Sequence, residues 1–158
     1  GIERKGAGMQ SDYNKLTELG EAAERLICGA PLAHGCGLMA NPAKFENPTA
    51  VDACLMIPAD VKTVTTPFRT ADRYGIEPDH AITLNVKSVN KYQASTPVMA
   101  IVFNVLIPGR EARRVAFLSE IERAIRSGKA QIHNYKTRND PRHATASYVL
   151  DERWFRKF

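Results

Sequence analysis

The chain of 158 residues is 44% hydrophobic and 25% charged, proportions typical of one globular domain and not of a disordered chain. No apolar run approaches the roughly 20 residues that a membrane-spanning helix needs, so we expect no membrane segment. The net charge is +5, with 8 Lys and Arg against 11 Asp and Glu in residues 1–79, and 14 against 6 in residues 80–158. The basic second half favours binding to phosphates, and a solubilising surface explains it equally well.

The first residues contain no apolar core of the kind found in signal peptides. We expect a flexible leader over residues 1–10 and a single domain over residues 11–158.

The cysteines follow neither a disulfide framework nor the spacing of zinc ligands, so free thiols are expected. They are Cys28, Cys36 and Cys54. Together these features favour a cytoplasmic protein.

Residues 11–29 have the pattern of a helix, which Ser11 or Asp12 can cap. Apolar side chains recur at helical spacing and predict one packed stripe. The stripe consists of Leu16, Leu19, Ala23, Leu26 and Ile27. With a rotation of about 100° per residue, Glu24 lies at the edge of this stripe and Glu21 points away from it.

A Gly- and Pro-rich loop is expected over residues 29–48, followed by several strands. The strand candidates cover residues 50–57, 60–66, 81–89, 97–106, 113–118 and 146–150. Segment 97–106 is continuously apolar and predicts a central strand covered on both faces. Ser119 and Glu122 form a capping-box pattern that opens a helix ending at Gly128. This order of elements predicts an α/β domain with a mixed sheet flanked by helices.

Two aspartates, Asp52 and Asp60, lie on consecutive strand candidates, and a short hairpin could bring their carboxylates together. Lys62 shares a face with Asp60, because side chains two residues apart in a strand point the same way. Converging carboxylates repel each other unless a cation such as Mg²⁺ or Mn²⁺ lies between them. Such an ion can activate water, which Lys62 can orient. A surface hairpin with a chance ion pair is the structural alternative.

This pattern resembles the PD-(D/E)xK nuclease superfamily, whose restriction-endonuclease-like fold has an αβββαβ core. In that motif an aspartate is followed by a short hairpin and (D/E)xK, here Asp52 and then Asp60-Val61-Lys62. Val51 stands where the proline of the family name would be. The stretch "GEAAER", from Gly20 to Arg25, is similar to the GxxxER helix of archaeal Holliday-junction resolvases, which places Glu24 in the metal site.

The resemblance implies a Mg²⁺-dependent DNA endonuclease, type II restriction-like enzymes among them, acting on double-stranded DNA as a homodimer. It implies that Asp52, Asp60, the Val61 carbonyl and Glu24 bind the metal while Lys62 assists the attacking water. Basic residues of the second half are candidates to hold the DNA backbone. They are Lys87, Lys91, Lys136 and Arg138. The alternatives are a non-catalytic nucleic-acid-binding or assembly module on the same fold, and an enzyme acting on another substrate.

Overall fold

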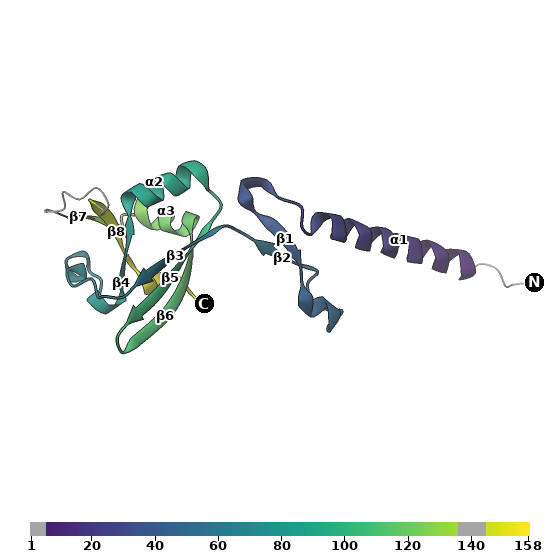
Figure 1. Ribbon diagram of the computed structural model, residues 1–158, viewed down its shortest axis with the longest axis horizontal. Helices are drawn as coiled ribbons and strands as arrows, with labels where there is room; N and C mark the ends of the chain where they lie inside the picture. The colour runs from purple at the N-terminus through teal and green to yellow at the C-terminus, as the bar shows by residue number, and fades with distance from the viewer. Residues whose placement is uncertain (1–5, 136–144) are drawn as a thin grey trace, which may run out of the picture. The chain divides into compact units, whose positions relative to one another are not determined.

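The computed structural model describes residues 6–135 and 145–158 (Figure 1). The chain divides into two compact units, residues 1–56 and residues 57–158, and each is described by itself. Both helices and sheets are present, as expected for a mixed α/β protein. In the part of the chain that the structure describes, no helix is long and apolar enough to cross a membrane.

The helices are α1 (Gly6–Ile27), α2 (Val86–Ser95) and α3 (Leu118–Arg126). The strands are β1 (Gly37–Ala40), β2 (Ala53–Met56), β3 (Ala59–Val64), β4 (Ala81–Asn85), β5 (Ala100–Ile107), β6 (Arg110–Phe117), β7 (Gln131–Asn134), β8 (Ala146–Asp151) and β9 (Arg156–Lys157). Short 3₁₀ helices cover Ala33–Gly35, Pro42–Phe45, Ala71–Tyr74, Pro78–His80 and Glu152–Trp154.

In the first unit, α1 begins at Gly6, ahead of Ser11 and Asp12, and so includes part of the expected leader. The apolar stripe of α1 is not covered by the rest of its own unit, since Leu16 is 68% and Leu26 79% exposed. Within the first unit, the expectation that this stripe is packed is therefore not met. Periodicity predicts an apolar helix face but does not reveal what covers it.

The strands of the first unit form an antiparallel hairpin in which Gly37 pairs with Met56. Strand β1 lies inside residues 29–48, which the sequence predicts as loop. The loop is expected because this stretch contains several Gly and Pro residues. Since β2 pairs with β1 and β3 belongs to another sheet, the expected hairpin between the two aspartate-bearing strands is wrong. Asp52 directly precedes β2, and Asp60 lies within β3.

The second unit contains a four-stranded sheet in the order β3-β5-β6-β9. Strands β3 and β5 are parallel, and the connection between them contains β4 and α2, as parallel neighbours require a crossover. Strands β5 and β6 form an antiparallel hairpin through a turn at Gly109, whose φ of +80° favours glycine. A second sheet has the antiparallel order β4-β8-β7.

The main core lies on one face of β5. Ile101, Phe103 and Val105 are almost fully buried, whereas Leu106 on the other face is 42% exposed. The expectation of burial on both faces is therefore wrong, although β5 is central in its sheet as predicted. Other elements add Ile82, Leu84, Val89, Leu118, Ile121 and Leu150 to this core.

Helix boundaries depart from the sequence expectation at two places. Strand β4 stops at Asn85 because its side chain caps α2, accepting a 2.9 Å hydrogen bond from the Lys87 N–H. Helix α3 begins at Leu118, and Glu120 accepts a 2.9 Å hydrogen bond from the Phe117 N–H. The predicted capping pair of Ser119 and Glu122 is therefore wrong.

Along the chain, α1, β1, β2, β3, α2 and β5 follow one another in the order αβββαβ, with β4 inserted before α2. Four strands therefore precede α2 where the expected core has three, so the order matches the expected core only in part. The strands of that core are divided between two sheets, with β1 and β2 in one and β3 and β5 in the other.

Candidate active site

Asp60 and Lys62 lie on the core-facing side of β3. Their ladder partners on β5 are Ile101 and Phe103, both fully buried, and paired residues of neighbouring strands point to the same face. The Nζ of Lys62 is 2.7 Å from Oδ2 of Asp60, and about a third of each side chain is exposed. Because β3 is the first strand in its sheet, the pair lies at the sheet edge and not in the middle.

Tyr92 of α2 completes this cluster, since its hydroxyl donates a hydrogen bond to Oδ2 of Asp60. The Nζ of Lys62 is also 6.0 Å from the centre of the Tyr92 ring, within reach of a cation–π attraction. Sequence reasoning missed Tyr92. The signal was its position three residues after the buried Val89, which places both on one face of α2.

Contact between Asp60 and Lys62 lowers the pKa of the aspartate and raises the pKa of the lysine. Burial raises the pKa of Asp60, but hydrogen bonds from Lys62 and Tyr92 and the Lys62 charge outweigh burial and hold it below its ordinary value. Burial lowers the pKa of Lys62, but Asp60 and Tyr92 outweigh burial and raise it above its ordinary value. Lys62 is therefore an ammonium group at neutral pH. It can donate hydrogen bonds and neutralise negative charge, but it cannot accept a proton.

Val61 lies between these two residues, with its side chain on the opposite face of β3 and 61% exposed. Its side chain therefore cannot contribute to the Asp60–Lys62 cluster. Only the main-chain carbonyl of Val61 is left as a possible ligand, and its role stays a prediction.

Asp52 belongs to the first unit and has a different partner. The Nζ of Lys44 donates hydrogen bonds to Oδ1 of Asp52 and, at 3.3 Å, to the carbonyl of Ala50. Asn41 binds the same segment, because its Nδ2 donates to the Val51 carbonyl at 2.9 Å. Sequence reasoning missed Lys44, because it belongs to no motif. Lys44 lies in the 3₁₀ helix Pro42–Phe45, and the segment that connects β1 and β2 folds back to bring it to Asp52.

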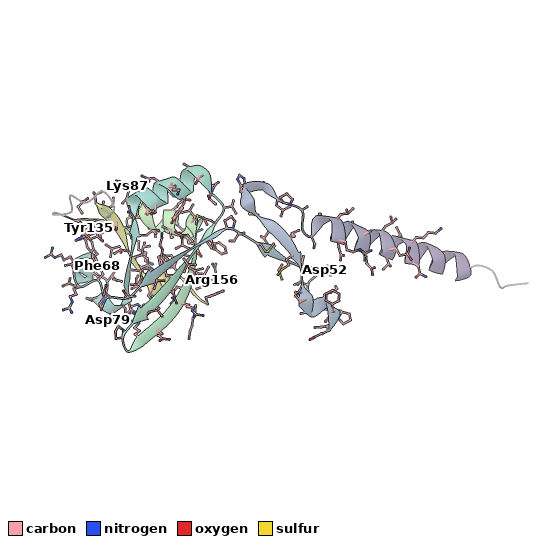
Figure 2. The ribbon with its side chains drawn as sticks, in the orientation of Figure 1. Asp52, Phe68, Asp79, Lys87, Tyr135 and Arg156 are labelled. Atoms are coloured by element: carbon pink, nitrogen blue, oxygen red, sulfur yellow. The ribbon has the colours of Figure 1, made fainter. Side chains whose placement is uncertain are left out.

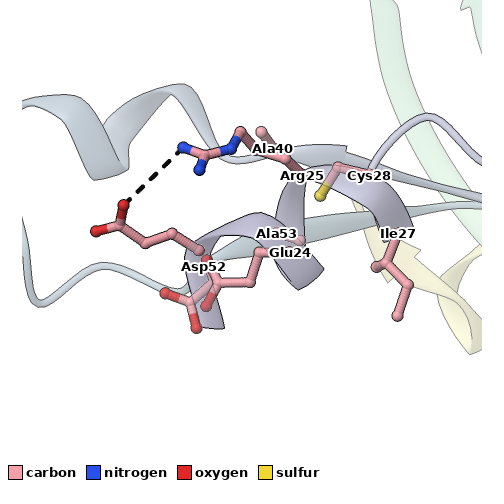
Figure 3. A pocket seen from close by; sticks show the side chains of 8 residues that line it. Glu24, Arg25, Ile27, Cys28, Ala40, Asp52 and Ala53 are labelled. Atoms are coloured by element: carbon pink, nitrogen blue, oxygen red, sulfur yellow. Dashed lines mark ion pairs between the residues drawn. The ribbon is translucent and has the colours of Figure 1, made fainter. Parts of the chain in front are cut away.

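A pocket of about 390 Å³ in the first unit brings Asp52 together with the acidic end of α1 (Figure 3). Glu21 and Glu24 both line it. Glu21 is 3.9 Å from Arg25, one helical turn later, and is therefore partly neutralised. Glu24 has no such partner among the described residues, so it is the better candidate to share a ligand with Asp52.

The oxygen donors of Glu24 and Asp52 suit a hard cation such as Mg²⁺ or Mn²⁺. Among residues 6–135 and 145–158, no three His, Cys, Asp or Glu side chains form a group that could hold a metal ion. Glu24 and Asp52 thus supply two carboxylates in the first unit, and Asp60 supplies one in the second. The donor chemistry of Glu24 and Asp52 fits the cation, although two carboxylates are fewer ligands than such an ion takes.

Two of the four basic residues expected to contact DNA lie on α2. Lys87, labelled in Figure 2, and Lys91 are both exposed. They lie one turn apart on α2 and therefore share a face of the helix. Lys136 and Arg138 fall outside the described residues. The structure therefore places two cations on the same helix that presents Tyr92 to Asp60.

A separate polar cluster, not anticipated from the sequence, surrounds Glu152. This carboxylate is fully buried, accepts hydrogen bonds from Arg110 and Arg114, and lies 2.9 Å from Nδ1 of His80. Burial raises the pKa of Glu152, but the bonds from Arg114 and His80 and the charges of the two arginines outweigh burial and lower it. The cluster links β6 to the segment that follows β8, so we assign it a structural role.

No protein-family model and no curated protein matches the chain. Among solved structures, a nuclease from a fusselovirus is similar over 99% of this chain and 90% of that chain. The sequence identity is 10% and the TM-score is 0.44. Neither value is high enough to assign a fold or an activity to this chain.

Proposed function

We propose that this protein is a metal-dependent deoxyribonuclease of the PD-(D/E)xK kind. The observation that carries the proposal is the ion pair of Asp60 and Lys62 at the edge of β3, with Tyr92 presented to it by the crossover helix. Two further features support it. The pair lies on the third strand along the chain, and a pocket in the first unit is lined by Asp52 and Glu24.

In this proposal Asp52, Asp60, the Val61 carbonyl and Glu24 would hold Mg²⁺, with Mn²⁺ as a substitute. When bound, the ion supplies an acidified water molecule and positive charge beside the scissile phosphate. Both Lys62 and Tyr92 bind Oδ2 of Asp60, so a ligand role for Oδ1 would leave their contacts in place.

Lys62 is the residue proposed to act on the reacting groups. Its raised pKa keeps it protonated, so it donates a hydrogen bond to the attacking water or to a phosphate oxygen. The ammonium charge then offsets the negative charge that develops on the phosphate in the transition state. In-line attack by water would leave a 3′ hydroxyl on the released strand.

The proposal requires Asp52 and Asp60 to bind the same ion. Ligand distances of about 2.0–2.6 Å then demand carboxylate oxygens no more than about 5 Å apart. It also assigns Lys87 and Lys91 to the DNA backbone, with Lys136 and Arg138 as further candidates. Cleavage of both strands of a duplex would use a two-fold dimer.

A second candidate is a nucleic-acid-binding or assembly module without catalysis. One observation favours it: each aspartate of the motif already has a lysine partner, Lys44 for Asp52 and Lys62 for Asp60. Ion pairs of this kind can serve structure alone. Under this candidate the basic residues bind nucleic acid, and neither aspartate binds a metal ion.

Supercoiled plasmid incubated with the full chain separates the two candidates. The nuclease proposal expects nicked or linear product with Mg²⁺, no product with EDTA, and no product with Asp60→Asn. Lys15→Met, a substitution on α1 outside the candidate site, is expected to cut like the wild type. Plasmid binding without cleavage at any Mg²⁺ or Mn²⁺ concentration would favour the binding module, and cleavage in EDTA would refute the metal-dependent mechanism.

A further inference from the structure

A second pocket lies in the unit formed by residues 57–158, and Lys62 is part of its wall. Its volume is about 410 Å³, within the roughly 300–1,000 Å³ typical of small-ligand sites. The pocket is lined by Lys62, Thr63, Val64, Thr65, Thr66, Pro67, Phe68, Ala81, Thr83 and Tyr135. These residues come from the end of β3, the segment that follows it, β4 and the residue after β7.

Two aromatic rings of this pocket are fixed by the same histidine. The ring of Phe68 lies 5.1 Å from that of His133 at 84°, and the ring of Tyr135 lies 4.7 Å from it at 74°. His133 is held in turn by the hydroxyl of Tyr74, 2.8 Å from its Nδ1. Aromatic side chains that are already positioned lose little conformational entropy when a ligand stacks on them.

The remaining lining is polar and suits a ligand with phosphate and sugar groups. Five hydroxyl groups are present, one from Tyr135 and four from threonines. The described lining includes no Asp or Glu, and Lys62, which also pairs with Asp60, adds an ammonium group. Hydroxyl and ammonium groups are the donors that proteins use toward the phosphates and sugars of nucleic acids.

We propose that this pocket is a nucleoside subsite that takes one unpaired nucleotide of a DNA strand. The base stacks on Phe68 or Tyr135, both of which Figure 2 labels. The threonine hydroxyls contact its sugar and phosphate, and the adjoining phosphate lies at Lys62. The inference rests on the proposed nuclease function for the role of Lys62. A base stacked inside a duplex cannot enter such a pocket, so the favoured substrate is single-stranded DNA or a single-stranded segment at a junction or end.

The test is fluorescence anisotropy of the full chain in EDTA at fixed salt, which measures binding without cleavage. The probes are a labelled oligothymidylate and a blunt hairpin duplex with the same number of nucleotides. Wild type is expected to bind the single strand more tightly. Phe68→Leu and Tyr135→Leu, which keep apolar volume but remove the ring, are expected to weaken single-strand binding by about tenfold and leave duplex binding unchanged.

Two variants make the test specific. Tyr135→Phe keeps the ring and is expected to retain single-strand binding, while Phe45→Leu removes an exposed ring that does not line the pocket. Circular dichroism verifies that each variant is folded. Equal affinity for both probes, or single-strand affinity that survives both leucine substitutions, would overturn the subsite.

The proposed function fails separately from this subsite. A wild type that binds single strands through Phe68 and Tyr135 in EDTA but never cuts with Mg²⁺ would keep the subsite and remove the nuclease. A wild type that cuts plasmid, with both leucine variants binding like the wild type, would keep the nuclease and remove the subsite.

Discussion

The Nζ of Lys62 and Oδ2 of Asp60 lie 2.7 Å apart on the core-facing side of β3, where Tyr92 also binds the carboxylate. This contact affects both the protonation of Lys62 and the binding of a cation to Asp60. It keeps the lysine protonated, and it makes the lysine compete with a cation for the carboxylate. Substitution of Lys62 should therefore affect catalysis and metal affinity in opposite directions.

Lys62→Met is expected to lower the rate of plasmid cleavage by about 10²–10³-fold, the usual cost of losing a group that stabilises transition-state charge. Affinity for Mn²⁺, measured by isothermal titration calorimetry, is expected to be retained or increased, because the ammonium no longer competes for Asp60. Lys15→Met serves as the matched control. Loss of metal binding together with activity would mean that Lys62 only maintains the structure.

Glu24→Gln is expected to weaken Mn²⁺ binding at least about tenfold, because a carboxylate that lines the pocket with Asp52 is replaced by a neutral amide. Glu21→Gln is the matched control, since Glu21 lines the same pocket but pairs with Arg25. It is expected to leave the affinity unchanged in the same calorimetric experiment. Equal losses in the two variants would contradict the assignment of Glu24.

The sequence was informative about elements with strong local patterns. Alternation and β-branched residues located β3, continuous apolarity located β5, and a glycine after α3 located the helix end. The face shared by Asp60 and Lys62 also followed from the two-residue period of a strand. Each of these features depends only on neighbours in the chain.

Features that depend on distant residues were missed. Tyr92 reaches Asp60 only because α2 crosses over between parallel strands, and Lys44 reaches Asp52 only through the turn after β1. Buried Glu152 carries no motif and depends on arginines of β6. The pairing of β2 was also misjudged, because a Gly- and Pro-rich surrounding concealed β1, its actual partner.

Tyr92→Phe is expected to reduce stability at neutral pH by about 1 kcal/mol through loss of a hydrogen bond to a charged group. The pKa of Asp60 lies below its ordinary value of 3.8 in the folded protein. The unfolded chain therefore binds more protons between these two values, and the stabilisation is lost as the pH falls through them. Without the Tyr92 hydroxyl the pKa of Asp60 rises, so the difference between variant and wild type should shrink below about pH 4.

Urea unfolding of wild type and Tyr92→Phe between pH 3 and pH 7, at constant ionic strength, measures this difference. Tyr148→Phe is the control, because Tyr148 packs against the core and its hydroxyl has no hydrogen bond within the described residues. A stability difference that stays constant down to the lowest pH would show that Asp60 does not respond to Tyr92.

Glu152→Gln is expected to be the most damaging of these substitutions, lowering the free energy of unfolding by about 3 kcal/mol. The amide has the same shape as the carboxylate but leaves Arg110 and Arg114 facing each other without a compensating charge. The pKa of Glu152 is lowered from its ordinary 4.5, so its contribution to stability is complete at neutral pH and lost in acid.

Urea unfolding at pH 7 measures the loss, with Glu111→Gln on the exposed side of β6 as the control. Because Glu152 lies outside the proposed site, the folded variant should still cut plasmid at low temperature, and a loss of cleavage without a loss of stability would place this cluster in the active site.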